Sequence, residues 1–114
     1  MTEEETMIVT TTPTLEGMPI VEYKGLVSGT AIHGVHVGKD FKAMGRNLVG
    51  GRPKTYEDEI DKGQSEAFAE MEKAAGGLGA NAIVGVSLDV EGVGTNTSML
   101  LVNVSGTAVV VGQA

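Results

Sequence analysis

The stretch that decides the fold is residues 98–111, which read SMLLVNVSGTAVVV. Alternate positions on one face are apolar, a period of two that is typical of a β-strand: Leu100, Val102, Val104, Ala108 and Val110. The other face is apolar at its two ends and polar between them, at Asn103, Ser105 and Thr107. Apolar residues on both faces of a strand predict cover on both faces.

The length of this stretch supports the same interpretation. Its 14 residues span about 46 Å when extended at roughly 3.3 Å each, whereas a compact domain of this chain length is roughly 35 Å across. We therefore expect either a break at Gly106 or a strand that reaches a neighbouring subunit. We favour the second, with a bend, and hence an oligomer.

Three further strands are expected outward from this one. Residues 80–91 alternate, with Ala82, Val84, Val86, Leu88 and Val90 on one face and polar or small residues on the other. Residues 7–12 form a short strand before Pro13. Residues 20–35 form a long strand or a hairpin, with an apolar face at Val21, Tyr23, Val27, Ala31 and Val35 and bulges at Gly25 and Gly29.

Two helices are expected between the strands. Residues 39–49 predict a short helix that ends at Gly50-Gly51. A longer helix begins near Thr55, which resembles the start of a capping box, and ends at Gly76-Gly77. Its predicted apolar face consists of Tyr56, Ile60, Ala67, Met71, Ala74 and Leu78, widened by Phe68 and Ala75. The fold class is therefore α+β, with an acidic tail at 1–6 and one domain at 7–114.

Composition excludes several functions. Fifteen acidic residues against 8 Lys and Arg give a net charge of −7, so neither nucleic acid nor a membrane surface is an expected partner. The chain has no cysteine, which excludes thiolate chemistry and disulfides. With no secretion signal or membrane span expected at its N-terminus or elsewhere, we expect the protein in the cytoplasm.

The chemistry-bearing residues form few patterns. His33 and His36 are the metal candidates, but on a strand their odd spacing places them on opposite faces, so two independent polar side chains are the simpler interpretation. Asp89 and Glu91 share a strand face, where they either hold a hard cation or are simply solvated. The Ser and Thr residues show no nucleophile motif, so we do not expect an enzyme.

The best ligand-binding candidate is the loop before the long helix. Glycines leading into a helix N-terminus can bind an anion through backbone amides, although this loop lacks the spacing of the known phosphate-binding motifs. A simple turn between two helices is the competing interpretation. The candidate residues around the loop are Asp40, Arg46, Gly50, Gly51, Arg52, Tyr56 and Glu57.

Four segments together resemble the YbjQ-like family, small bacterial and archaeal proteins labelled as heavy-metal-binding. They are Met7-Ile-Val-Thr-Thr-Thr, Val49-Gly-Gly-Arg52 followed by Tyr56-Glu57, Gly79-Ala-Asn-Ala-Ile-Val-Gly-Val86, and Gly106-Thr-Ala-Val109. The resemblance runs from about Met7 to Val111. The family usually has Arg-Asp where this chain has Lys39-Asp40, and an Asn where His36 stands.

The resemblance implies a dodecin-like subunit, with a curved antiparallel sheet wrapped on a helix and assembled into a ring, a homopentamer. We therefore expect a homo-oligomeric binding protein for a divalent metal ion or a small ligand. The absence of cysteine argues against soft metals, which prefer thiolates. The alternatives are a structural ring that binds a partner protein and an enzyme with a site at the subunit junctions.

Overall fold

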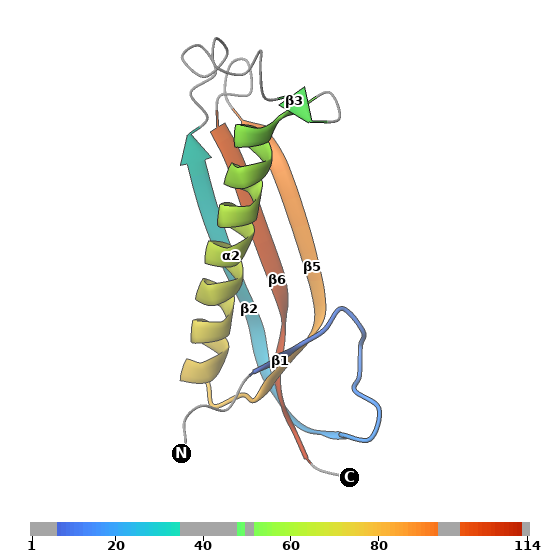
Figure 1. Cartoon of the computed structure of the whole chain (residues 1–114). Coiled ribbons are helices and arrows are strands. Elements are labelled where there is room, and N and C mark those ends of the chain that lie inside the picture. Colours follow the sequence, from blue (N-terminus) through green and yellow to red (C-terminus); the bar gives the residue numbers. More distant parts are fainter. Residues whose placement is uncertain (1–6, 35–47, 50–51, 94–98, 113–114) are drawn as a thin grey trace.

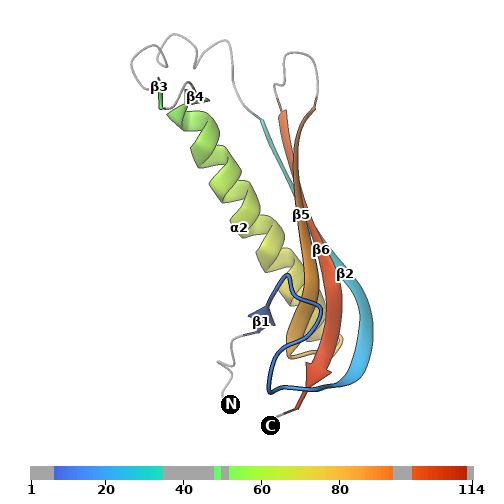
Figure 2. The ribbon, with the colours of Figure 1, turned by 90° about the vertical axis from the view of Figure 1, so that its right-hand side faces the viewer.

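The protein is an α+β fold in which one long helix lies along one face of a curved sheet (Figures 1 and 2). The computed structural model describes residues 7–34, 48–49, 52–93 and 99–112, with the backbone alone at 48–49 and 52–56. The sheet has the strand order β1-β5-β6-β2. Its strands are β1 (Ile8–Val9), β2 (Ile20–Gly34), β5 (Ala82–Val93) and β6 (Met99–Val111), and the helix is α2 (Lys54–Gly77).

The predicted C-terminal strand is the central strand of the sheet. β6 pairs antiparallel with β5 on one side and with β2 on the other. It runs unbroken through Gly106, where a Cβ would lie 2.7 Å from the Cγ2 atom of Ile83. The strand break considered at Gly106 is therefore absent. The glycine instead makes room for the side chain of Ile83. The molecule is 54 Å long, so its own elongation accommodates the strand.

The two apolar faces of β6 are covered within the chain except near Met99, which is 40% exposed. On one face Val102, Val104 and Ala108 pack against α2. At the C-terminal end the opposite face, with Val109 and Val111, is buried under residues of the N-terminal segment, namely Ile8, Leu15, Met18 and Ile20. The prediction that this end needs a neighbouring copy to cover it is therefore wrong, because residues 8–20 fold back over it.

The sheet is mixed rather than wholly antiparallel, because β1 runs parallel to β5. β5 also departs from the predicted alternation. Gly85 has φ +62°, and the register with β6 shifts between Val84 and Ser87. This bulge places Val86 in the same core cluster as Ile83, while Val84 belongs to the other cluster. A glycine in the left-handed region adds one residue to the strand and exchanges its faces from there on.

β2 is one continuous strand, as one of the two sequence interpretations stated. Gly25, with φ +127°, lies at a register shift, which confirms the bulge predicted there. Gly29 is different, because the pairing with β6 is regular on both sides of it. A Cβ on Gly29 would collide with the main-chain carbonyl of Ala67, so this glycine lets α2 pack directly on the strand.

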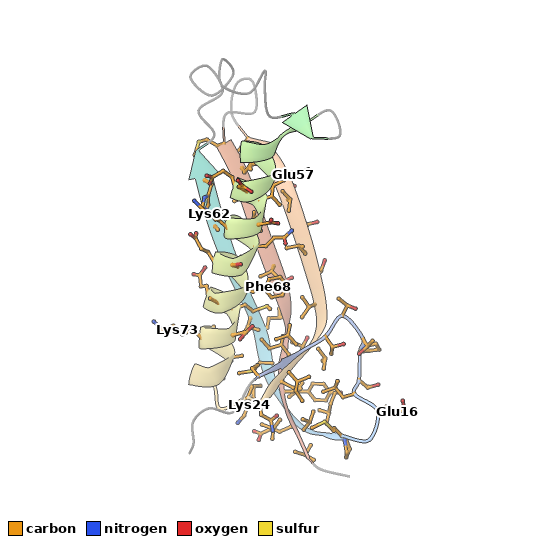
Figure 3. The ribbon with its side chains drawn as sticks, viewed as in Figure 1. Glu16, Lys24, Glu57, Lys62, Phe68 and Lys73 are labelled. Carbon is orange, nitrogen blue, oxygen red and sulfur yellow. The ribbon has the colours of Figure 1, made fainter. Side chains whose placement is uncertain are left out.

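α2 begins and ends close to the predicted bounds, but its buried face is narrower than predicted. Gly63, Ala67, Met71 and Ala75 are buried, whereas Ala74 is exposed and Leu78 is 45% exposed. Phe68 packs against the edge of the core. Figure 3 shows it between α2 and the strands, with Lys73 directed to the opposite side. Apart from Met71, the buried residues at every fourth position are small, which lets helix and sheet approach closely.

The predicted helix at 39–49 lies mostly outside the described residues. Its last two residues form the strand β3 (Leu48–Val49), which pairs antiparallel with β4 (Arg52–Pro53). Leu48 and Val49 are therefore not helical. The division into a tail at 1–6 and one domain at 7–114 stays a prediction.

The sheet face away from α2 is polar over its middle. The cross-strand rows there are Ser28, Ser105 and Ser87, and Thr30, Asn103 and Asp89. The Thr30 hydroxyl donates a hydrogen bond to Oδ1 of Asn103 at 2.9 Å. Asp89 is exposed, which agrees with the solvated interpretation of the Asp89 and Glu91 pair. Because the residues are polar, this part of the face needs no apolar cover.

Candidate functional site

The described titratable side chains gather most closely around His33, at the end of β2 that lies under the N-terminal half of α2. Its Nδ1 atom lies 2.7 Å from Oε1 of Glu59, and its Nε2 atom lies 2.9 Å from Oε1 of Glu66. Glu59 and Glu66 are seven residues apart, two turns of one helix face. We name the three residues His33, Glu59 and Glu66 the His33 clip.

Gly63 shapes the seat of the His33 ring. It lies on the same helix face as Glu59 and Glu66, between them. A Cβ on Gly63 would lie 3.9 Å from Cδ2 of His33 and 2.7 Å from Cγ2 of Val102. Without that atom, the imidazole lies close to the helix backbone and both of its nitrogens reach a carboxylate.

The electrostatics of the clip favour the charged imidazole. A neutral histidine donates one hydrogen bond, whereas the imidazolium donates two, and here both ring nitrogens face carboxylate oxygens. The hydrogen bond to Glu66, followed by the one to Glu59, raises the pKa of His33 above its usual 6.5, and partial burial opposes the rise. Lys62 lies 4.0 Å from the second oxygen of Glu59.

A third carboxylate continues this helix face toward the core. Oε1 of Glu70 accepts a hydrogen bond from the backbone amide of Thr30 at 2.8 Å. Because Thr30 lies on β2, an edge strand of the sheet, this amide would otherwise be open to solvent or to another strand. Glu59, Glu66 and Glu70 together fasten α2 along β2.

The clip does not have the form of a metal site. Its two carboxylates contact opposite nitrogens of one ring, so they cannot surround a single ion together with that ring. A zinc ion would hold Nδ1 and a carboxylate oxygen about 3.3 Å apart, from bonds of about 2.0–2.1 Å, whereas Nδ1 and Oε1 of Glu59 are 2.7 Å apart. Within the described residues, no group of three His, Asp or Glu side chains is arranged to hold a metal.

Most of the predicted site residues lie outside the described part of the chain. This applies to His36, Asp40, Arg46, Gly50 and Gly51. Arg52 lies in β4 and Tyr56 in the first turn of α2, where the backbone alone is described. Glu57 is half-buried in that first turn, where a carboxylate suits the helix dipole. The binding loop therefore stays a prediction.

The residues that sequence reasoning missed are Glu59, Gly63, Glu66 and Glu70. The sequence contained one indication on the strand side. His33 lies an even number of positions from Val27 and Ala31, so it is on the same strand face, which faces the helix. On the helix side, positions 59, 63, 66 and 70 share one face, but a face with three glutamates is typical of a solvated surface. Nothing in the local spacing connects that face with His33.

The described residues of the four segments that suggested a family lie in or beside β1, in the β3–β4 pair and the first turn of α2, in or beside β5, and in β6. A family model described as "Putative heavy-metal-binding", YbjQ, matches residues 7–112. The chain belongs to the YbjQ family. A UPF0145 protein of Clostridium botulinum (strain Alaska E43 / Type E3) is 52% identical over 103 residues, which are 90% of this chain and 97% of that protein.

A solved structure shows the same fold. It is a protein of unknown function of the DUF74 family from Pediococcus pentosaceus ATCC 25745, with a TM-score of 0.66 and 22% identity over 92% of this chain and 97% of that one. Neither the Pediococcus pentosaceus protein nor the UPF0145 relative has a name that states an enzymatic activity. In the described part of this YbjQ-family chain, no helix is long and apolar enough to span a bilayer.

Proposed function

We propose that this protein is a non-enzymatic, ring-forming binding subunit, and that its copies associate through β2. The supporting observation is the exposure of large apolar side chains on that strand. Val21, Tyr23, Leu26 and Ile32 are 65%, 70%, 85% and 58% exposed. A long edge strand with exposed apolar residues is a surface on which another chain can pair or pack. The family resemblance favours five copies.

The two edges of the sheet support a second copy of this chain as the partner. β2 forms one outer edge, and its described residues pair only with β6. At the opposite edge β1 pairs with β5 only at Ala82 and Ile83, so residues 87–93, which pair with β6 on their inner side, have no strand partner on their outer side among the described residues. Two different open edges on opposite sides suit a head-to-tail interface, and such an interface forms a ring when the rotation between successive copies closes.

The assembly is tested by sedimentation velocity and native mass spectrometry at micromolar concentration. We expect a single multiple of the 11.7 kDa chain, and five copies if the family resemblance holds in this respect. Leu26→Glu and Ile32→Glu place charges on exposed positions of β2 and are expected to shift the protein toward smaller species. Leu78→Glu is the matched control, because Leu78 is also exposed, at 45%, but lies just beyond the C-terminal end of α2.

Two results would contradict this proposal. One is a folded monomer for the unaltered chain at micromolar concentration. The other is an oligomer whose size is the same in Leu26→Glu, Ile32→Glu and Leu78→Glu, because the association surface would then lie elsewhere. Circular dichroism of each variant distinguishes a dissociated subunit from an unfolded one.

The family description raises the question of a bound heavy metal, and the described residues do not fit one. The chain has no cysteine, although thiolates are the ligands that soft metals prefer. Of its two histidines, His33 is held by two carboxylates, and its raised pKa means that a proton competes with any metal for the ring. We therefore assign no metal to the His33 clip.

Calorimetric titration with zinc, nickel, copper and cadmium tests this assignment. Micromolar affinity that disappears in His33→Ala alone would contradict our assignment, whereas affinity that disappears only in the His33→Ala/His36→Ala double variant would point to a metal held through His36. Micromolar affinity that survives in this variant would point to a metal site away from both histidines. Affinity no tighter than millimolar for all four metals leaves a small ligand or a partner protein as the bound species.

A partner protein and a small ligand are distinguished by what the ring retains on purification. Native mass spectra that show a small molecule at fixed stoichiometry would support the ligand. One stoichiometric protein recovered with the ring, without a small molecule, would support the scaffold. We place the assembly in the cytoplasm as part of the same proposal, which cell fractionation tests.

A further inference from the structure

The two halves of α2 are held to the sheet in different ways. From Ala67 onward, the buried helix residues Ala67, Met71 and Ala75 belong to the main core cluster. Before Ala67, among the described side chains, Gly63 is the one helix residue classed as buried. Figure 2 shows the helix axis diverging from the sheet toward the Lys54 end. Among residues 57–66, whose side chains the structure describes, apolar packing is therefore less extensive than from Ala67 onward.

The His33 clip lies on this less packed part of the helix, as far as its described side chains extend. It joins the end of β2 to Glu59 and Glu66, both in the N-terminal half of the helix. The side chains of His33 and Glu59 are only 16% and 21% exposed, so water screens this pair less than a surface pair. Hydrogen bonds in which both partners are charged are stronger than neutral ones.

The charged groups around His33 come from one side. On α2 they are Glu59, Glu66 and, behind Glu59, Lys62, while Glu70 is engaged with the Thr30 amide. Across the sheet, His33 is paired with Leu100 of β6, and Leu100 with Gly92 of β5, neither of which carries a charge. Within the described elements, histidine is thus the side chain of the clip that changes charge near neutral pH.

From this arrangement we propose that His33 is a proton-controlled clip on α2. The imidazolium holds the N-terminal half of the helix on the end of β2, and loss of its proton releases that half while the half from Ala67 onward stays packed. This function does not depend on the proposed ring. It makes the docking of residues 54–66 a property that pH can change without unfolding the domain.

The direction of the pH dependence follows from the charge. The pKa of His33 is raised in the docked state from its usual 6.5. The stabilisation from the clip is therefore complete below 6.5 and is lost as the pH rises through the raised pKa. The equilibrium constant for detachment of residues 54–66 is therefore larger above this pH range than below it. The increase is a factor of ten for each unit by which the pKa of His33 in the docked state exceeds its pKa in the detached state.

Two measurements on the full-length chain test the proposal. NMR titration of the imidazole signals, assigned with His33→Gln, gives the pKa of His33 in the docked state. Hydrogen exchange, corrected for the intrinsic pH dependence, gives protection factors for residues 54–66 and 67–77 across the same pH range. We expect protection of 54–66 to fall with rising pH by the factor that the measured pKa predicts, and protection of 67–77 to change little.

Variants make the outcome decisive. In His33→Gln, residues 54–66 should be poorly protected at every pH, and in Glu66→Gln the pKa of His33 should fall toward 6.5 with a smaller change in protection. A His33 pKa at or below 6.5 in the unaltered chain would overturn the proposal. So would an equal pH dependence of protection in the two halves of α2. Both of these results are measured on the unaltered chain, so the proposal can be overturned even if a variant fails to fold.

Discussion

The main chain of α2 at Ala67 lies so close to Gly29 of β2 that a Cβ on Gly29 would overlap the Ala67 carbonyl oxygen. A side chain can rotate away from such an overlap, but the backbone of a packed helix cannot. Gly29 is therefore required by a close approach between two elements rather than by its own conformation. The contact fixes the height of the helix above the sheet and hence the reach of the His33 clip.

Gly29→Ala is expected to lower the free energy of unfolding by more than about 3 kcal/mol, the upper end of the usual range for overpacking. Urea unfolding followed by circular dichroism measures the change at one protein concentration. Gly34→Ala, in the same strand with nothing within 4 Å of its Cβ, is the control and should change stability by no more than about 1 kcal/mol. Equal stability of the two variants would disprove the close approach.

Gly63→Ala tests the second close approach of α2. Alanine improves helix propensity by about 1 kcal/mol, but its Cβ would lie 2.7 Å from Cγ2 of Val102. Val102 is 1% exposed, and a β-branched side chain has little rotational freedom. We expect a net loss of about 1–2 kcal/mol in urea unfolding.

The Gly63 result has two internal checks. Gly76→Ala in the same helix has nothing within 4 Å of its Cβ and should be neutral or stabilising by up to about 1 kcal/mol. Combining Gly63→Ala with Val102→Ala should cost less than the sum of the two single changes, because the smaller residue removes the overlap. If the two free-energy changes are strictly additive, the loss of stability in Gly63→Ala does not come from the overlap with Val102.

The sequence predicts the outline of this fold because the long elements carry regular patterns. The helix after Thr55 and the strand at residues 98–111 follow periods near 3.6 and 2. β5 shows where that reasoning fails. Gly85 inserts one residue at positive φ, and the alternation after it refers to the other face. A single sequence offers no way to tell such a glycine from an ordinary strand residue.

The candidate site is less predictable, because its contacts are distant in sequence. Glu59 and Glu66 are 26 and 33 positions from His33, so no local spacing reveals them. The covering of Val109 and Val111 by residues near Met18 was missed for the same reason. An apolar face shows that something covers it, but not whether the cover comes from the same chain.

Asn81 extends the sheet with its side chain. Its Oδ1 accepts from the amide of Val111 at 2.8 Å, and its Nδ2 donates to the carbonyl of Val111 at 3.0 Å. Asn81→Ala removes both bonds and should cost about 1–3 kcal/mol in urea unfolding. Asn81→Asp keeps the acceptor but sets a carboxylate against the Val111 carbonyl, so it should be no more stable than Asn81→Ala. Recovery of stability in Asn81→Asp would contradict the two-bond geometry.

The His33 clip predicts a pH-dependent stability. His33→Gln should lower the free energy of unfolding most below pH 6.5, where the imidazolium is fully engaged in the unaltered chain. The difference should narrow as pH rises through the raised pKa. Urea unfolding from about pH 5.5 to about pH 9 covers the range in which histidine titrates. A difference that is constant across this range would show that the ring contributes by packing and not by charge.

The amide of Thr30 offers a test at a single atom. Glu70 accepts its hydrogen bond at 2.8 Å, and this amide lies on the outer edge of the sheet, where no strand pairs with it among the described residues. In Glu70→Ala the Thr30 amide is expected to exchange with solvent at least about tenfold faster, while the amides that face β6 keep their rates. In Glu70→Gln the side-chain oxygen still accepts but without the charge, so the exchange rate should lie between those of the unaltered chain and Glu70→Ala.

Unchanged exchange in Glu70→Ala would mean that another group shields this edge, and a neighbouring copy of the chain on β2 is the candidate that the proposed ring supplies. Repeating the measurement in Leu26→Glu, which is expected to weaken the ring, then separates shielding by Glu70 from shielding by the neighbour.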